Sequence, residues 1–240
     1  MRYADFHRRS IEDRDGFWAE QARLIDWHTP FTRVCNNDKP PFTRWFEGGR
    51  TNLCHNAVDR HLKDRAQQNA LIFVSTETDV ERIYSFEALH AEVQRMAAVL
   101  LAQGVKPGDI VGVWQKRDAA LVVNLLAIQQ AGGAYLPFDE STPVGRVEQI
   151  IQQAGVRFLC SDKALSLSGV TLLDLTAQGS EAVQLAPLQA EQAAYVLFTS
   201  GSTGEPKGVA PGPLNWRTAQ DRNHHAPPHH RILRQPAPLP

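Results

Sequence analysis

The stretch AAYVLFTSGSTGEPKGVA, residues 193–210, joins an apolar run to a loop rich in glycine and hydroxyl side chains. The run at 193–199 has the composition of a β-strand and leads directly into the loop. Glycines let consecutive backbone N–H groups converge on an anion, hydroxyl groups add donors that rotate toward oxygens, and a lysine adds positive charge. The stretch therefore predicts a strand followed by a phosphate-binding loop.

The candidate phosphate-binding residues of this loop are Thr199, Ser200, Gly201, Ser202, Thr203, Gly204 and Lys207. Their spacing differs from the Walker A loop, in which glycine, lysine and a hydroxyl residue follow one another directly. Here Glu205 and Pro206 separate the last loop glycine from the lysine. The alternative is a flexible glycine–serine linker, but a linker needs neither a strand before it nor a rigid proline directly before the lysine.

Upstream of the loop, short apolar strands alternate with helices, which predicts an α/β fold with a mostly parallel sheet covered by helices. Three helices are predicted to begin at Ser85, Asp118 and Thr142-Pro143 and to end at Gly104, Gly132-Gly133 and Gly155. Asp139 is expected to be a turn residue, and Arg146 a surface or packing residue. The predicted strands are 70–75, 110–114, 134–137, 156–161, 170–175 and 193–199.

The two ends of the chain have different compositions from this middle part. Residues 1–69 are polar and aromatic, and we expect an extension with helices near 13–26 and 56–67 and irregular chain between them. Residues 211–240 are rich in proline and histidine without hydrophobic period, which predicts disorder. The histidine pairs of this tail could bind a divalent metal, but the residues between them fix no geometry. These histidines are His224, His225, His229 and His230.

The composition of the 240-residue chain excludes several classes of protein. A formal net charge of −1 argues against nucleic acid or an anionic membrane as a partner. No stretch approaches the ~20 apolar residues that span a bilayer, and charged residues at the start rule out a secretory signal, so we expect a cytoplasmic protein. Cys35, Cys54 and Cys160 are widely spaced and predict reduced thiols without a disulfide or a metal site.

The loop string resembles the signature loop of the adenylate-forming (AMP-binding) superfamily, which includes acyl-CoA synthetases, luciferases and adenylation domains of nonribosomal peptide synthetases. WAEQARLIDWHTPF (18–31) and RWFEGGRTNLCHNAVDRH (44–61) are similar to propionate–CoA ligases and their acetyl-CoA synthetase relatives. LLAIQQAGGAYLPFDESTPVGRVEQIIQQAGVRFLCSD (125–162) and the stretch 193–210 are similar to peptide-synthetase adenylation domains. Residues 1–113 thus resemble one branch of the superfamily and residues 114–210 another.

The resemblance implies that residues 70–210 are a partial AMP-binding domain behind an extension of acetyl-CoA synthetase type. It also implies a reaction in which a propionate-like carboxylate attacks ATP, with Mg²⁺, to give acyl-AMP and pyrophosphate. The acceptor would be CoA or the phosphopantetheine of a carrier protein. Lys163-Ala164-Leu165-Ser166-Leu167 stands where the CoA ligases have an arginine- and glycine-rich segment, which weakens the CoA assignment.

Catalytic residues of the superfamily, among them a lysine of its C-terminal domain, have no matching position in this sequence. The chain is therefore interpreted as a truncated part of an acid–thiol ligase, and its catalytic residues are unknown. Two alternatives stay open. One is an amino-acid-activating adenylation domain of a nonribosomal peptide synthetase. The other is a non-catalytic truncated or hybrid fragment, so the sequence does not decide whether this chain is itself an active enzyme.

Overall fold

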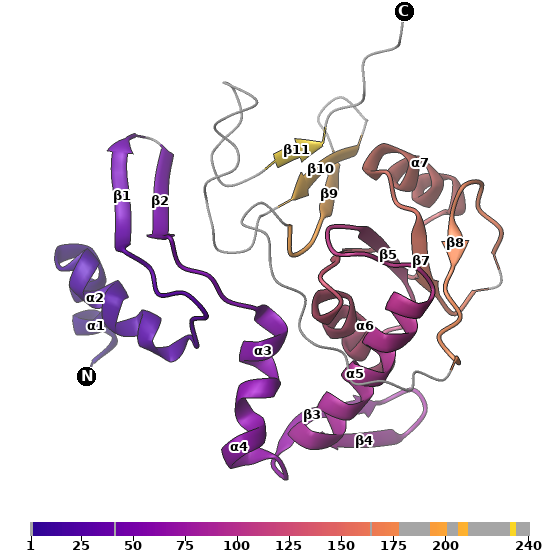
Figure 1. Cartoon of the computed structure of the whole chain (residues 1–240), viewed down its shortest axis with the longest axis horizontal. Coiled ribbons are helices and arrows are strands. Elements are labelled where there is room, and N and C mark those ends of the chain that lie inside the picture. Colours follow the sequence, from indigo (N-terminus) through magenta and orange to yellow (C-terminus); the bar gives the residue numbers. More distant parts are fainter. Residues whose placement is uncertain are drawn as a thin grey trace, which may run out of the picture.

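The computed structural model describes residues 2–40, 42–163, 165–177, 193–200, 206–210 and 231–233 (Figure 1). The N-terminal region, residues 2–52, contains α1 (Tyr3–Glu12), α2 (Arg14–Gln21), the 3₁₀ turn η1 (Ala22–Leu24) and an antiparallel hairpin. The hairpin consists of β1 (Arg33–Lys39) and β2 (Phe42–Glu47), where the sequence predicted irregular chain. That prediction was wrong because β1 carries mostly polar side chains and β2 has Trp45 and Phe46 next to each other, so neither strand shows a clear alternation.

Aromatic side chains hold the N-terminal region together. The ring of Phe17, only 1% exposed, packs edge-on against Phe6 at 4.7 Å and Trp18 at 5.2 Å. Trp18 then contacts Trp45 of β2 at 5.8 Å, so that the helices and the hairpin share one cluster. The helix predicted near 13–26 ends earlier, at Gln21, and continues only as the 3₁₀ turn.

The segment 53–85 leads from the N-terminal region to the sheet. The helix predicted near 56–67 is divided into α3 (Leu53–Ala57), η2 (Asp59–His61) and α4 (Leu62–Arg65). The division falls at Val58, whose φ of −128° and ψ of −66° are not helical and whose side chain is fully buried. Next, β3 (Asn69–Ser75) confirms the first predicted strand and pairs with β4 (Val80–Ser85), which was not predicted.

The predicted parallel sheet is present, with strand order β6-β5-β7-β8 and every neighbouring pair parallel. Its strands are β5 (Ile110–Trp114), β6 (Ala134–Pro137), β7 (Phe158–Ser161) and β8 (Thr171–Leu172). The last of these is much shorter than the strand predicted at 170–175. Because the chain runs from β6 across β5 to β7, the direction of winding changes between β5 and β7. In parallel sheets of this kind, ligand sites lie beyond the carboxyl ends of the strands.

Helices cover both faces of this sheet, as predicted. Side chains of α5 (Phe86–Ala102) and α6 (Ala119–Gln130) share one core cluster with Val111 and Val113 of β5. Those of α7 (Val144–Ala154) form a second cluster with Leu136 and Leu159 on the other face. The predicted caps are also confirmed, since Ser85 Oγ accepts a hydrogen bond from the Ala88 N–H and Gly155 ends α7 with a φ of +66°.

The last strands form a separate antiparallel sheet with the order β11-β10-β9. It consists of β9 (Leu197–Ser200), β10 (Pro206–Ala210) and β11 (Arg231–Leu233). The strand predicted at 193–199 therefore begins later and has an antiparallel partner that the sequence did not indicate. The sequence predicted disorder for 211–240, where the structure describes only the three residues of β11 and gives them a strand conformation. The remainder of that tail, with its four histidines, lies outside the described residues.

Candidate functional site

The chain enters the candidate loop from the edge of the parallel sheet. The backbone N–H of Val196 donates to the carbonyl oxygen of Tyr135 in β6 at 2.8 Å, and Tyr195 forms a parallel bridge with the same residue. The two tyrosine rings stack with centroids 5.7 Å apart. Burial, and secondarily Tyr195, raises the pKa of Tyr135 above its ordinary value. Val196 is fully buried, so the segment before the loop is anchored to the sheet by this backbone hydrogen bond and by a buried side chain.

Strands β9 and β10 bring the two ends of the loop together. In their antiparallel register the backbone of Thr199 lies opposite Lys207 and that of Ser200 opposite Pro206. Three of the predicted phosphate-binding residues, Thr199, Ser200 and Lys207, are thus placed at one end of one hairpin. The other four, Gly201, Ser202, Thr203 and Gly204, lie outside the described residues. Their assignment stays a prediction.

Hydrogen bonds and ion pairs occupy the carboxyl edge of the parallel sheet. Asp139, just after β6, accepts hydrogen bonds from the hydroxyl and N–H of Ser141 and pairs with Arg117 at 2.5 Å. These contacts, with Ser141 the largest contributor, lower the pKa of Asp139 to about 2. Asp118 caps α6 by accepting the Leu121 N–H at 3.0 Å. The interpretation of both aspartates as turn and cap residues is confirmed.

Lys163 is the cation that stands in the segment where the resembled CoA ligases have arginines. Its Nζ lies 3.9 Å from the ring centroid of Trp114 and donates to the carbonyl oxygen of Glu140 at 2.8 Å. The Trp114 Nε1–H in turn donates to the carbonyl oxygen of Asp139 at 3.0 Å. The ammonium group is therefore engaged with the protein's own rim, by a cation–π contact and a hydrogen bond.

A cavity of about 810 Å³ lies beside this rim. Its walls come from the β3–β4 hairpin, from the residues between β5 and α6, and from Glu140. Cations and carboxylates occur together in the lining, so the cavity has no net preference for an anion. The charged lining residues are Glu77, Arg82, Lys116, Arg117, Asp118 and Glu140.

The cysteines and the possible metal ligands of the described residues form no reactive or metal-binding group. All three cysteines are free, in agreement with the predicted reduced thiols, and all three are also buried. Burial raises the pKa of Cys54 and of Cys160 to about 12, which keeps both as neutral thiols. Within residues 2–40, 42–163, 165–177, 193–200, 206–210 and 231–233, no group of three or more His, Cys, Asp or Glu side chains could hold a metal ion. In the same part, no helix is both long and apolar enough to cross a bilayer.

Sequence reasoning missed two features that shape this region. The stacked pair of Tyr135 and Tyr195 was not predicted, although each tyrosine stands in a predicted apolar strand, at 134–137 and at 193–199. The pairing of β9 with β10 was overlooked because PKGVA, with a proline and a glycine, has few signs of a strand.

The strand order, the covering helices and the anchored β9–β10 hairpin define an α/β domain with a parallel sheet. The family model described as AMP-binding enzyme matches residues 58–215, and the one described as acetyl-coenzyme A synthetase N-terminus matches residues 3–57. The chain therefore belongs to the AMP-binding enzyme family.

Curated relatives and solved structures agree with this assignment. The propionate–CoA ligase of Escherichia coli K12 is 37% identical, over 87% of this chain and 40% of that protein. The acetyl-coenzyme A synthetase of Vibrio cholerae is 30% identical, over 86% of this chain and 39% of that protein. The chain thus spans about 40% of the length of these relatives.

Two solved structures have a similar fold. The acetoacetyl-CoA synthetase of Streptomyces lividans has a TM-score of 0.74 at 24% identity, over 89% of this chain and 38% of that one. The N-terminal subdomain of Klebsiella oxytoca NpsA, in complex with 3-hydroxybenzoyl-AMSN, has a TM-score of 0.60 at 25% identity, over 68% of this chain and 41% of that one. The predicted likeness to the adenylate-forming family is confirmed.

Proposed function

We propose that this chain forms the phosphate-binding part of an ATP-dependent acid–thiol ligase. The whole enzyme would activate a short, propionate-like carboxylate as acyl-AMP, release pyrophosphate and transfer the acyl group to CoA. The observation that carries the proposal is the β9–β10 hairpin, which places Thr199 opposite Lys207 within a chain of the AMP-binding family. The similarity to propionate–CoA ligase over most of this chain supports the choice of substrate.

In this proposal the residues at 199–204 bind the β and γ phosphates of ATP through backbone N–H groups and hydroxyls. Lys207 adds a positive charge beside them, where charge accumulates on the leaving pyrophosphate. The hairpin register fits these roles, because both ends of the loop start from one point anchored through Val196 to the sheet. Mg²⁺ would enter bound to the ATP phosphates, and a cytoplasmic location without nucleic-acid or membrane partners completes the proposal.

A second candidate is an adenylation domain that passes an activated amino acid to the phosphopantetheine of a carrier protein. It is favoured by Lys163, whose ammonium group already contacts Trp114 and the Glu140 carbonyl. A free CoA phosphate would have to compete with both contacts for this cation. The phosphopantetheine of a carrier protein lacks the phosphorylated nucleotide of CoA, so it does not need this cation.

Exchange of labelled pyrophosphate into ATP tests these proposals. The protein is incubated with ATP, Mg²⁺ and either propionate or each of a panel of amino acids, and acceptor specificity is then measured with CoA and with a phosphopantetheinylated carrier protein. Exchange that depends on propionate, followed by transfer to CoA, supports the ligase. Dependence on an amino acid supports the adenylation domain. If no carboxylate promotes exchange, the interpretation as a non-catalytic fragment is supported instead.

Binding of ATP can be measured separately from turnover. We expect Lys207→Ala to weaken ATP binding about tenfold or more, because it removes a charge-assisted contact to phosphate. The matched control is Lys106→Ala, which removes an exposed lysine from the turn before β5. Isothermal calorimetry with ATP measures both variants. Equal affinities of Lys207→Ala and the control would contradict the role of Lys207.

A further inference from the structure

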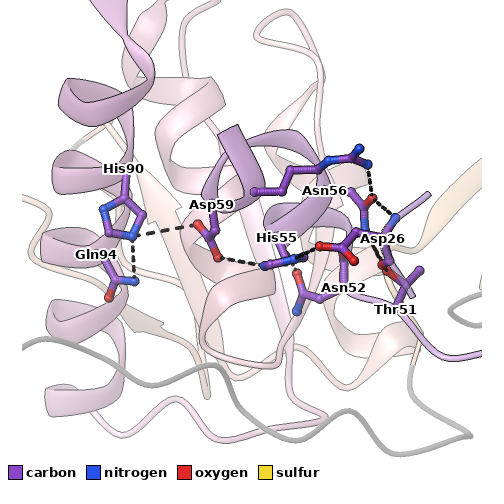
Figure 2. A network of polar contacts seen from close by, with 9 residues as sticks. Asp26, Thr51, Asn52, His55, Asn56, Asp59, His90 and Gln94 are labelled. Atoms are coloured by element: carbon purple, nitrogen blue, oxygen red, sulfur yellow. Dashed lines mark hydrogen bonds and ion pairs between the residues drawn. The ribbon is translucent and has the colours of Figure 1, made fainter. Parts of the chain in front are cut away.

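A polar network crosses the boundary between the two matched family regions (Figure 2). The carboxylate of Asp26 lies 2.7 Å from His55 Nε2 in α3. On the other side of this imidazole, Nδ1 lies 3.8 Å from Asp59 Oδ2 in η2, and Asp59 Oδ1 lies 3.8 Å from His90 Nε2 in α5. Asp26 and His55 belong to the acetyl-coenzyme A synthetase N-terminus, whereas Asp59 and His90 belong to the AMP-binding region.

The same place holds the N-terminal region against α3 and η2 by further hydrogen bonds. The Asp26 N–H donates to Asn56 Oδ1 at 2.8 Å, and Thr51 Oγ1 donates to the Asp26 carbonyl at 2.6 Å. Arg60 Nη1 donates to the carbonyl oxygen of Leu24 at 2.7 Å. A change in the charge of the network therefore acts on the joint between the N-terminal region and the rest of the chain.

The hydrogen bonds fix which imidazole nitrogens carry protons when both histidines are neutral. His55 Nε2 must hold its hydrogen to donate to Asp26, so Nδ1 turns a lone pair toward Asp59. His90 Nε2 lies 3.3 Å from the amide nitrogen of Gln94, a donor, so it also presents a lone pair. Asp59 is only 15% exposed and its Oδ1 has no hydrogen-bond partner. Its carboxylate thus faces two acceptors, an unfavourable arrangement for a largely buried charge.

We propose that His55, Asp59 and His90 form a proton-dependent latch that fastens α3, and through Asp26 the N-terminal region, to α5. Protonation of either imidazole replaces a lone pair with an N–H donor and adds a positive charge facing Asp59. At His90 Nε2 the hydrogen bond from the Gln94 amide is exchanged for one to Asp59. The 3.8 Å contacts then become ion pairs, and the unpartnered oxygen gains a donor. The fastened state is favoured while an imidazole of the latch is protonated, and loss of that proton at higher pH removes the ion pairs.

Other charged groups around the latch do not reverse this direction. The His55 hydrogen bond is the largest cause that lowers the pKa of Asp26 below its ordinary value, so this carboxylate is ionised at mildly acidic and neutral pH. On α5, Glu87 accepts from Gln67 and Glu92 pairs with Arg95. Helix α6, which packs on α3, contains no charged residue. The remaining ionisable groups are His28, whose ring lies 5.2 Å from that of His55, and, on the neighbouring elements, Cys54, Arg60, His61, Lys63, Asp64, Arg65, Glu81, Arg82 and Tyr84.

Amide hydrogen exchange of the full chain between about pH 5.5 and about pH 8 tests the latch. The reporters are the amides of His28 and Arg50, which bond across the N-terminal region to Arg50 and Thr29 carbonyls. After correction for the intrinsic exchange rate, we expect their protection to be about threefold to fivefold higher at the acidic end, a size typical of partly exposed ion pairs. The amides of Val111 and Leu159 in the central sheet serve as the internal reference.

Variants identify the groups responsible. The double variant His55→Gln/His90→Gln cannot be protonated, so we expect its protection to be independent of pH, and Asp59→Asn should give the same flat profile. The control His7→Gln changes an exposed histidine of α1 and should keep the dependence. If protection of these amides does not depend on pH in the unmodified chain, the proposal is overturned. This result does not depend on whether any variant folds. Retention of the dependence in the double variant overturns it as well.

Discussion

The parallel sheet and the N-terminal region are built on different physical principles. In the sheet, apolar side chains of β5 and β7 alternate between the two faces, and helices cover both faces. In the N-terminal region, edge-on aromatic rings and polar contacts join short elements whose own patterns are weak. The first kind of structure follows from periodicity along the chain, whereas the second depends on contacts between residues far apart.

The largest expected effect is a loss of unfolding free energy at a core position next to the parallel sheet, compared with its exposed neighbour in the same helix. Leu100 is fully buried in the cluster between α5 and the sheet, and Leu101 is 36% exposed. Leu100→Ala should lower the free energy of unfolding by about 2–5 kcal/mol, because it removes buried methyl groups and leaves a cavity. Leu101→Ala should change it by less than about 1 kcal/mol. Urea unfolding measures both, and similar losses would contradict the assigned core.

The second prediction concerns the aromatic cluster of the N-terminal region. Phe17→Ala should remove about 3 kcal/mol of local stability, since Phe17 is the ring shared by the contacts to Phe6 and Trp18. Hydrogen exchange should then rise in α2 and β1 while the amides of β5 remain protected. Tyr3→Ala, at a ring that is 80% exposed, is the control. Equal loss of protection in β5 would show that the two regions unfold as one unit.

The smallest expected effect concerns the rim of the sheet. The pKa of Asp139 is about 2, lowered first by Ser141 and then by Arg117. A carboxyl group with a lowered pKa in the folded state contributes stability above its ordinary pKa, near 4, and loses it as the pH falls toward 2. Arg117→Ala should raise this pKa toward the ordinary value, and a carboxyl-carbon NMR titration measures the shift. An unchanged midpoint would contradict the pairing with Arg117.

Much of the sheet unit could be predicted from the sequence. Helices α5 and α6 could be placed because Ser85 and Asp118 are capping residues directly before apolar runs, and Gly155 marks the end of α7. The antiparallel partner β4 could not be predicted, since Glu81 and Arg82 lie exposed in its middle. The interruption at Val58 has no local signal, because neither glycine nor proline stands there.

The candidate site also has one part that could be predicted from the sequence and one part that could not. The motif residues Thr199 and Lys207 could be selected because glycine, hydroxyl and lysine chemistry is visible in a short string. Their pairing across β9 and β10 and the stack of Tyr195 on Tyr135 could not, because these depend on tertiary contacts. The network around Asp59 was also invisible, since His90 lies on a helix whose pattern is explained by its apolar face alone.

The buried break at Val58 has a consequence for recombination between relatives. The two family models meet between Ala57 and Val58, so an exchange of modules at this point would cut beside a fully buried core side chain. It would also take His55 from one parent and Asp59 from the other. A crossover at Gln67-Gln68, in the turn before β3, keeps both within one parental segment. A chimaera made there takes His55 and Asp59 from one parent. His90 comes from the other parent, so that parent should also have a histidine at this position.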